Sequence, residues 1–364
     1  MKCVRGASRV GGAAGVCALA MTAALAQTAP QPAKRTPAVV VTVTGVPMPL
    51  ATESASVSLI PQEEIETSQA GDAAELLGQS AFVNVEQQGG DMAFTTMTVR
   101  GGKPNQVLVM IDGIPVNDLS NLLGGAFDFS SLALSNVERV EMVRGPMSSV
   151  YGSEAVSGVV NFITKRGARP ATWTLDDGFG SFGAAQASGA NRGAAGRMSY
   201  AVDAALSRIG EQTGNDGASL YTGDADLNVP VDARRVWTLV SRYATRHANE
   251  FPTGSGGSEY AVNRAAETDR TGDLVAGSSW QHQVNDVWLY RVEGNLFRRT
   301  AYNYTPPILD GTPPGPASLP SSDGHTRFSR VELRGSNLFT LGRHWSARAG
   351  GGWRRESGVS RSVL

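Results

Sequence analysis

The second half of the chain alternates apolar and polar residues over segments that are long for a globular protein. From Met198 to Leu206 the even-numbered residues are apolar or aromatic, and the odd-numbered residues are small or polar. The same period of two runs through Trp288–Leu296 and Trp345–Trp353, and it places successive side chains on opposite faces of a β-strand. We therefore expect about nine strands, near residues 172–180, 182–191, 196–208, 219–230, 233–246, 268–284, 285–301, 324–341 and 342–358.

Two arrangements of these strands fit the alternation. In a soluble antiparallel β domain the apolar faces would point into a shared core. In an outer-membrane barrel they would point into lipid, and the polar faces would line an aqueous lumen. The barrel is favoured because several segments exceed the usual strand length of about 5–6 residues, and because every tryptophan and all tyrosines but Tyr151 lie after Ala171. The polar run Arg291, Glu293 and Asn295 suits either arrangement.

The N-terminus has the three parts of a secretory signal peptide. Lys2, Arg5 and Arg9 form a positive region, an apolar stretch follows, and Ala24–Ala26 fits a signal-peptidase site. We therefore expect residues 1–26 to be cleaved and the protein to leave the cytoplasm. Cleavage removes both cysteines, so no disulfide is expected in the mature protein. The formal net charge of −1, without a basic cluster in the sequence, argues against a nucleic-acid partner.

The first half of the mature chain mixes short helices with short strands. Pro61–Ser68 and Asp72–Gln79 read as helices, with Asp72 as a possible N-cap. Val107–Ile111 is a continuous apolar run that ends in Asp-Gly, which is typical of a buried strand entering a turn. Val137–Val143 and Val156–Thr164 look like two further strands. These elements predict a compact α+β domain.

Three linked sequence blocks in this half resemble the plug domain of TonB-dependent outer-membrane receptors. They are Val99–Gly102 with Val107–Asp118, Val137–Pro146, and Ser149–Ala155 with Gly158–Thr164. Within that family they look closest to the cobalamin-receptor-like members. The resemblance implies an α+β plug domain over residues 45–168, followed by antiparallel transmembrane β-barrel strands over residues 172–364.

A barrel of this family has about 22 strands, so the nine strands expected here would form an incomplete barrel. Open sheet edges are not tolerated in lipid. The sequence also ends at Leu364 without the terminal aromatic signal expected of outer-membrane barrels. We therefore expect this sequence to be the N-terminal part of a longer receptor.

Charged residues of the plug motifs are candidates for the contact between plug and barrel. Such pairs must seat the plug and still be exchangeable for water. The candidates are Arg100, Glu138, Arg139, Glu141 and Arg144. The alternative is that they are solvated strand charges, worth about 0–1 kcal/mol each. Turns of the plug, where glycine allows positive φ or close backbone approach, are expected at Gly101, Asp112, Gly113, Gly145, Pro146, Tyr151 and Gly152.

A β-prone segment after the signal peptide resembles a TonB box, by which the energy-coupling protein TonB pulls on the plug. It lies in a Pro- and Ala-rich segment, residues 27–44, which is expected to be flexible. The residues are Val39, Val40, Val41, Thr42 and Val43. A short extended peptide on a loose tether suits strand addition to a partner's sheet edge. The alternative is that this segment is only the first strand of the plug.

Family comparison places substrate contacts in two plug loops, Gln87–Phe94 and Asn117–Phe127. A small apolar tip in the second loop suits a bulky ligand, although a packed turn fits equally well; it consists of Leu122, Leu123, Gly124 and Gly125. Asp216, Asp224 and Asp226 fall near a loop where cobalamin receptors bind calcium. They are better read as ordinary turn and lumen acids, so no metal or other cofactor is expected.

Other chemical signals in the sequence do not support an enzyme. Gly178–Gly183 spells GxGxxG, but the residues after it lack helical periodicity, so a hairpin turn is expected there instead. The four histidines are scattered, without zinc-ligand spacing, and no nucleophile–base pair is visible.

The resemblance and the strand pattern together predict TonB-dependent uptake of a bulky scarce nutrient, such as a corrinoid or an iron siderophore, across the bacterial outer membrane. The partners expected are the TonB complex, the small-molecule ligand, outer-membrane lipid and the barrel assembly machinery. The alternatives are a non-transporting binding module, an inactive receptor fragment, or a secreted soluble β-rich enzyme.

Overall fold

The computed structural model of the chain describes residues 39–40, 48–49, 56–90, 92–121, 123–211, 216–250, 266–307, 320–342 and 345–363. The predicted signal peptide lies outside these residues, as do Val41, Thr42 and Val43 of the predicted TonB box and Leu122 of the predicted ligand loop.

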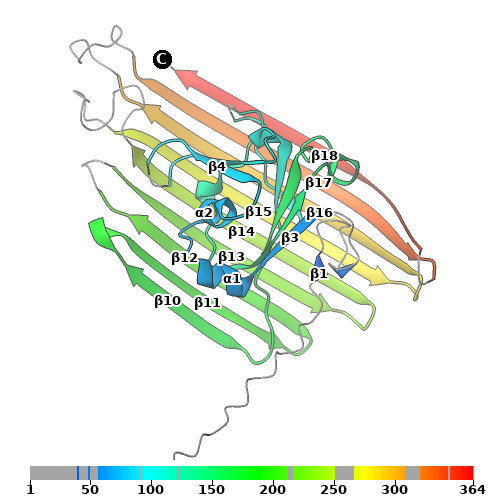
Figure 1. Cartoon of the computed structure of the whole chain (residues 1–364). Coiled ribbons are helices and arrows are strands. Elements are labelled where there is room, and N and C mark those ends of the chain that lie inside the picture. Colours follow the sequence, from blue (N-terminus) through cyan, green and yellow to red (C-terminus); the bar gives the residue numbers. More distant parts are fainter. Residues whose placement is uncertain are drawn as a thin grey trace, which may run out of the picture. The chain divides into compact units, whose positions relative to one another are not determined.

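Consecutive antiparallel strands form one 9-stranded sheet, coloured from green at β10 to red at β18 in Figure 1. From β14 onward the strands have 16 to 19 residues, more than the roughly 9–11 that a membrane-spanning strand needs. The prediction of about nine strands is confirmed, with ends shifted by a few residues. The strands are β10 (Thr172–Phe179), β11 (Ala185–Ala195), β12 (Met198–Ile209), β13 (Gly217–Pro230), β14 (Arg235–Glu250), β15 (Glu267–Gln283), β16 (Trp288–Thr305), β17 (Ser322–Thr340) and β18 (Ser346–Val363).

On the strands β12–β17 the polar face of this sheet is covered and the apolar face is more exposed, whereas the edge strands β10 and β18 are exposed on both faces. On β12, Asp203 is 8% exposed whereas the adjacent Val202 is 53% exposed. On β14, Arg242 is buried whereas Tyr243 is exposed. A soluble β domain would bury the other face, because burial of apolar surface is what stabilises it. The arrangement is the one predicted for an outer-membrane barrel. We call the two sides the plug-facing face and the outward face.

The connections alternate between the two edges of the sheet, and the three longest of them lie at the same edge. The short-turn edge carries the connections 196–197, 231–234, 284–287 and 341–345. The opposite edge, which we call the long-connection edge, carries 180–184, 210–216, 251–266 and 306–321. The first of these contains the GxGxxG sequence, which forms a 3₁₀ turn, Ser181–Gly183, between two strands. It is a hairpin connection, as predicted.

The plug is built on a 5-stranded sheet in the order β3-β8-β9-β6-β7. Its strands β6 and β9 are parallel and the other pairs are antiparallel. Every residue of β6 and β9 is buried, as expected for continuous apolar runs covered on both faces. The strands are β3 (Ser56–Pro61), β6 (Val107–Ile111), β7 (Ile114–Pro115), β8 (Val137–Arg144) and β9 (Gly158–Thr164), with separate hairpins of β4 (Val83–Gln87) with β5 (Thr95–Val99) and of β1 (Val39–Val40) with β2 (Met48–Pro49).

Short helices connect these strands. Asp72 caps α2, because its side chain accepts a hydrogen bond from the Glu75 N–H at 2.8 Å. Among the described residues no helix is both long and apolar enough to cross a membrane. The helical segments are α1 (Gln62–Ser68), α2 (Ala73–Gly78), α3 (Ser148–Tyr151) and the 3₁₀ turns η2 (Pro104–Gln106) and η3 (Phe129–Ser131).

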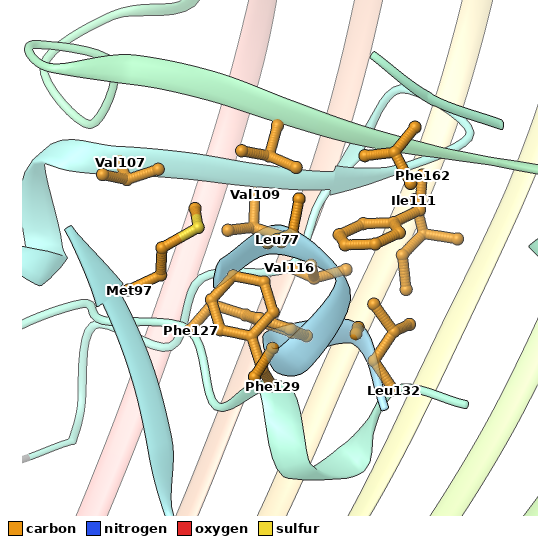
Figure 2. Packing of buried hydrophobic residues seen from close by; sticks show 14 of the residues in the cluster. Leu77, Met97, Val107, Val109, Ile111, Val116, Phe127, Phe129, Leu132 and Phe162 are labelled. Atoms are coloured by element: carbon orange, nitrogen blue, oxygen red, sulfur yellow. The ribbon is translucent and has the colours of Figure 1, made fainter. Parts of the chain in front are cut away.

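The plug has its own apolar core, gathered around α2. Leu77 of α2 packs with Met97 of β5 and Phe162 of β9, and these side chains point toward one another in Figure 2. Phe127 and Phe129 meet edge to face, with ring centroids 4.9 Å apart, a favourable aromatic geometry. This core fixes the segment that leads into η3, where the contact with the sheet begins.

Candidate functional site

The contact between plug and sheet has an apolar centre. Val275, Phe297 and Phe328, on β15, β16 and β17, belong to the same buried cluster as the plug core. Ile114 of β7 packs where Gly277 lacks a side chain, since a Cβ at Gly277 would come within 2.6 Å of the Ile114 Cδ1. The plug therefore sits on the sheet partly by excluding water from apolar surface.

Asp128 is the most densely bonded charge at this contact. It caps η3, accepting hydrogen bonds from the Ser130 N–H at 3.1 Å and the Thr95 N–H at 3.2 Å. Its carboxylate also accepts from Arg299 of β16 at 2.7 Å, and Arg246 of β14 lies 3.8 Å away. One plug carboxylate thus bridges two strands of the sheet.

Opposing effects act on the Asp128 carboxyl. Complete burial would raise its pKa, but the Arg246 and Arg299 guanidiniums and the hydrogen bonds outweigh burial and hold the pKa below its ordinary value. Each arginine also has a carboxylate partner within the sheet: Arg299 lies 3.1 Å from Asp273, and Arg246 pairs with Asp269. The group is a buried network rather than an isolated ion pair.

A second network centres on Glu154, in the turn after α3. Its carboxylate lies 2.8 Å from Arg330 of β17 and 3.5 Å from Arg354 of β18. Burial raises the pKa of Glu154 above its ordinary value, with Glu332 and Glu356 adding to the effect, although the two arginines oppose it. Glu154 is therefore held less firmly in its charged form than Asp128.

The charges predicted from the motifs make other contacts. Arg139 pairs with Glu138 at 2.8 Å and Glu141 at 3.0 Å, all on β8. Arg144 donates to the Ala81 carbonyl at 2.9 Å and to Ser58, and Arg100 lies near Gly145. These contacts run within the plug, so a role for these residues in seating the plug stays a prediction. Asp128 and Glu154 were not among the predicted contacts.

Five of the seven predicted turn residues have positive φ, whereas Tyr151 is the last residue of the helix α3. Gly101, Gly113, Gly145 and Gly152 all have positive φ, between 75° and 129°, which a side chain would strain. Asp112, also at positive φ, accepts from the Thr164 hydroxyl at 2.7 Å, and Pro146 and Tyr151 lie in the same motif around α3. The Gly113 carbonyl accepts from Arg334 of β17 at 3.1 Å, so this turn also touches the sheet.

A polar cavity of about 870 Å³ lies between the plug and the short-turn half of the sheet. On the plug side Glu138, Arg139 and Tyr151 line it, and Arg291 and Glu293 line it from β16. Burial raises the pKa of Tyr151 to about 12.

The two predicted ligand loops lie at the long-connection edge. The Gly90 N–H donates to Glu250, the last residue of β14, at 3.3 Å, and the Met92 carbonyl accepts from Arg246. In the second loop Leu123 is 38% exposed, and Gly124 and Gly125 both have positive φ. This position suits ligand contact, which stays a prediction.

Asn117 fixes the second loop to the plug sheet. Its buried amide accepts from the Val109 N–H at 2.8 Å and donates to the Val107 and Gly125 carbonyls at 2.9 and 2.7 Å. The sequence contained this residue within a motif but gave no sign of its role.

We expect Asn117→Ala to destabilise the plug by about 1–3 kcal/mol, because it leaves buried backbone groups without partners. The free energy of unfolding in detergent measures this, with Asn84→Ala, at an exposed position of β4, as the matched control. Equal stabilities of the two variants would contradict the assignment.

Two of the aspartates that were interpreted as ordinary turn and lumen acids lie on a strand of the large sheet. Asp224 and Asp226 are buried on the plug-facing face of β13, and Asp224 lies 3.4 Å from Arg242. Within the described ranges no three carboxylate, histidine or cysteine side chains are grouped closely enough to hold a metal ion.

Comparison with known proteins matches this architecture. Residues 49–159 match the family model of the TonB-dependent receptor plug domain. The vitamin B12 transporter BtuB of Vibrio cholerae serotype O1 is 27% identical over 319 residues, which cover 85% of this chain and 49% of that protein. The BtuB of Vibrio vulnificus is 36% identical over 126 residues, or 35% of this chain. The chain spans about half the length of the first of these curated relatives.

Solved structures share the fold. The ferripyoverdine receptor of Pseudomonas aeruginosa superposes with a TM-score of 0.71 at 15% identity, covering 90% of this chain and 46% of that one. The ferric yersiniabactin receptor FyuA of Yersinia pestis gives a TM-score of 0.59 at 14% identity, covering 85% of this chain and 62% of that one.

Proposed function

We propose that this chain, whose residues 49–159 match the TonB-dependent receptor plug domain, takes part in active uptake of a bulky scarce nutrient across the bacterial outer membrane. The observation that carries this proposal is the reversed sheet, whose charged face holds a plug while its apolar face is exposed. The nutrient is a corrinoid or an iron siderophore, and the similarity in sequence to vitamin B12 transporters favours the corrinoid.

The mechanism follows from how the plug is held. Ligand contacts the loops at the long-connection edge, of which the loop that contains Gly90 and Met92 is bonded to Glu250 and Arg246 of β14. The polar contacts between plug and sheet are ion pairs and hydrogen bonds. Water can replace these contacts when force is applied to the plug. TonB supplies that force through the segment that includes Val39 and Val40. No covalent bond of the nutrient changes, so the protein is not an enzyme.

The proposed route to the membrane uses general export machinery. A cleaved signal peptide over residues 1–26 carries the chain to the periplasm, and the barrel assembly machinery inserts the strands. The proposed location is the outer membrane, with the short-turn edge toward the periplasm.

We expect deletion of Val39–Val43 to abolish uptake and to leave nutrient binding within about twofold, because force transmission is lost while the ligand loops remain. The gene is expressed together with any coding sequence that follows residue 364. Uptake of labelled cyanocobalamin and of ferric siderophores is then measured in cells. Deletion of residues 28–32, in the same Pro- and Ala-rich segment, is the control and should keep uptake. Unchanged uptake after the first deletion would refute the mechanism. Binding without uptake in the unaltered receptor would favour the non-transporting binding module.

A further inference from the structure

Charge is unevenly distributed between the two faces of β14–β18. The strand register assigns the outward positions, and Asp323 is the one described carboxylate among them. The acids of these strands otherwise lie at plug-facing positions, where Asp269, Asp273, Glu293, Glu332 and Glu356 pair with arginines. Exposed arginines remain at the outward positions: Arg235, Arg270, Arg298, Arg327, Arg355 and Arg361.

Two of these arginines, Arg270 and Arg361, lie in one cross-strand row with two histidines near the long-connection edge. Direct cross-strand pairing joins His247 to Arg270, Arg270 to Tyr302, Tyr302 to His325, and His325 to Arg361. The Arg270 guanidinium lies over the Tyr302 ring, 5.9 Å from its centroid. The row continues beyond these strands to Arg208 of β12 through Ser219.

Arg361, at the end of this row, forms a compact group with two neighbouring arginines. We call this group the outward basic patch; it consists of Arg298, Arg327 and Arg361. Arg298 opposes Ser329 and Arg327 opposes Val359, so each arginine is the diagonal neighbour of the next. Diagonal residues are about 7–8 Å apart. None of the three has an ion-pair partner among the described residues; the nearby Asp323 contacts the His325 imidazole at 3.2 Å.

Such a group is unfavourable in the protein alone. Like charges on adjacent strands repel, and cations beside an apolar surface lack solvation. An anion from outside the protein would remove both costs. Guanidinium groups bind phosphate particularly well, since their planar donors match two phosphate oxygens.

An apolar groove begins beside the patch. It has a volume of about 710 Å³ and is lined by outward residues from β12 to β17. Ala225, Ser241 and Ala276 are small and lie in one cross-strand row between Val202 and Leu296. Leu296 is two residues from Arg298 on the same face of β16, or about 7 Å along the strand. The groove and the patch therefore form one continuous surface.

The short-turn edge of the outward face has a different chemistry. Trp288 stacks on Phe339 with centroids 6.1 Å apart, and Tyr290 packs beside it. Arg235 at this edge is neutralised by Asp232 at 2.5 Å. This edge is an aromatic girdle of the kind found at membrane interfaces, and it holds no group of adjacent outward arginines among the described strand residues.

We propose that the outward basic patch and the groove bind one phosphorylated lipid, with its phosphates on Arg298, Arg327 and Arg361 and an acyl chain in the groove. A free anion would explain the arginines but not the groove, and an uncharged lipid would explain the groove but not the arginines. The proposal rests on the membrane placement of the proposed function. It adds that the leaflet at the long-connection edge is rich in phosphorylated lipid.

The test measures lipid binding to the full chain purified in detergent, by native mass spectrometry with diphosphorylated lipid A and its dephosphorylated form. We expect the triple variant R298Q/R327Q/R361Q to bind the phosphorylated lipid at least tenfold more weakly. The control R197Q/R234Q/R235Q, three exposed arginines around the short turns, should bind within twofold. Ala276→Phe, which fills the groove, should also weaken binding at least fivefold.

Two further results would overturn the proposal. One is equal binding of phosphorylated and dephosphorylated lipid, and the other is full competition by inorganic phosphate, which would indicate an anion site without a lipid. Circular dichroism shows whether each variant keeps its strands. Binding is measured without TonB or nutrient, so a failure here is distinguishable from a failure of the uptake proposal.

Discussion

Arg299→Gln should destabilise the protein by about 3–5 kcal/mol, the cost of leaving buried charge uncompensated. Arg299 is buried and lies 2.7 Å from Asp128 of the plug and 3.1 Å from Asp273 of the sheet. Without it, Arg246 is the remaining cation partner of Asp128 among the described residues. The free energy of unfolding, from urea titration in detergent, measures the change, and protease sensitivity of the plug should rise with it.

The adjacent residue provides a matched control. Arg298→Gln changes the same side chain on the same strand, but at an exposed outward position, so a change within about 0.5 kcal/mol is expected. Adding Asp128→Asn to Arg299→Gln should restore part of the loss, since it removes the unpaired carboxylate. Equal stabilities of Arg299→Gln and Arg298→Gln would show that the network does not hold the plug.

Lowering the pH should destabilise the protein through the same network of charges around Asp128. The pKa of Asp128 is lowered in the folded protein, so its contribution to stability is fully present above the unfolded value of about 3.9. It is lost as pH falls through the lower, folded value. Arg299→Gln removes one of the two charges that lower this pKa, so the acid-induced loss of stability in that variant should begin at higher pH.

The sheet could be predicted from sequence because one face of each strand is covered and the other is not. Alternation such as Met198–Leu206 reports that difference directly, and it fixed both the number of strands and the face that each residue occupies. In the plug, the buried runs of β6, β8 and β9 were equally visible. The β4–β5 hairpin was not, since Val83–Gln87 and Thr95–Val99 are short and only partly periodic.

The charges that hold the plug could not be predicted, because their partners lie far along the chain. Asp128 and Arg299 are 171 residues apart, and Glu154 and Arg330 are 176 apart. Asp128 and Glu154 are each a single acid in a turn, and no periodic pattern in the sequence distinguishes them from other acids. Arg139 lies in a recognisable motif, yet its described partners are on its own strand. Local sequence identifies the elements, whereas packing of the plug on the sheet selects which charges meet.

Leu333→Arg should separate the two arrangements that fitted the alternation at the outset. Leu333 lies near the middle of β17, on the outward face, and is 54% exposed. If that face meets lipid, an arginine there should cost about 2–4 kcal/mol. If it meets water, the same change at an exposed position should stay within about 0.5 kcal/mol. The free energy of unfolding is measured in lipid vesicles, where the two expectations differ most.

The comparison needs a charge introduced on the other face of the same strand. Ser336 lines the polar cavity on the plug-facing face, so Ser336→Arg places the same side chain beside water and should cost little. A large loss for Leu333→Arg with a small loss for Ser336→Arg requires lipid on one face and water on the other. The reverse order would mean that the exposed apolar face is not a membrane surface, and both the uptake proposal and the lipid site would then lose their premise.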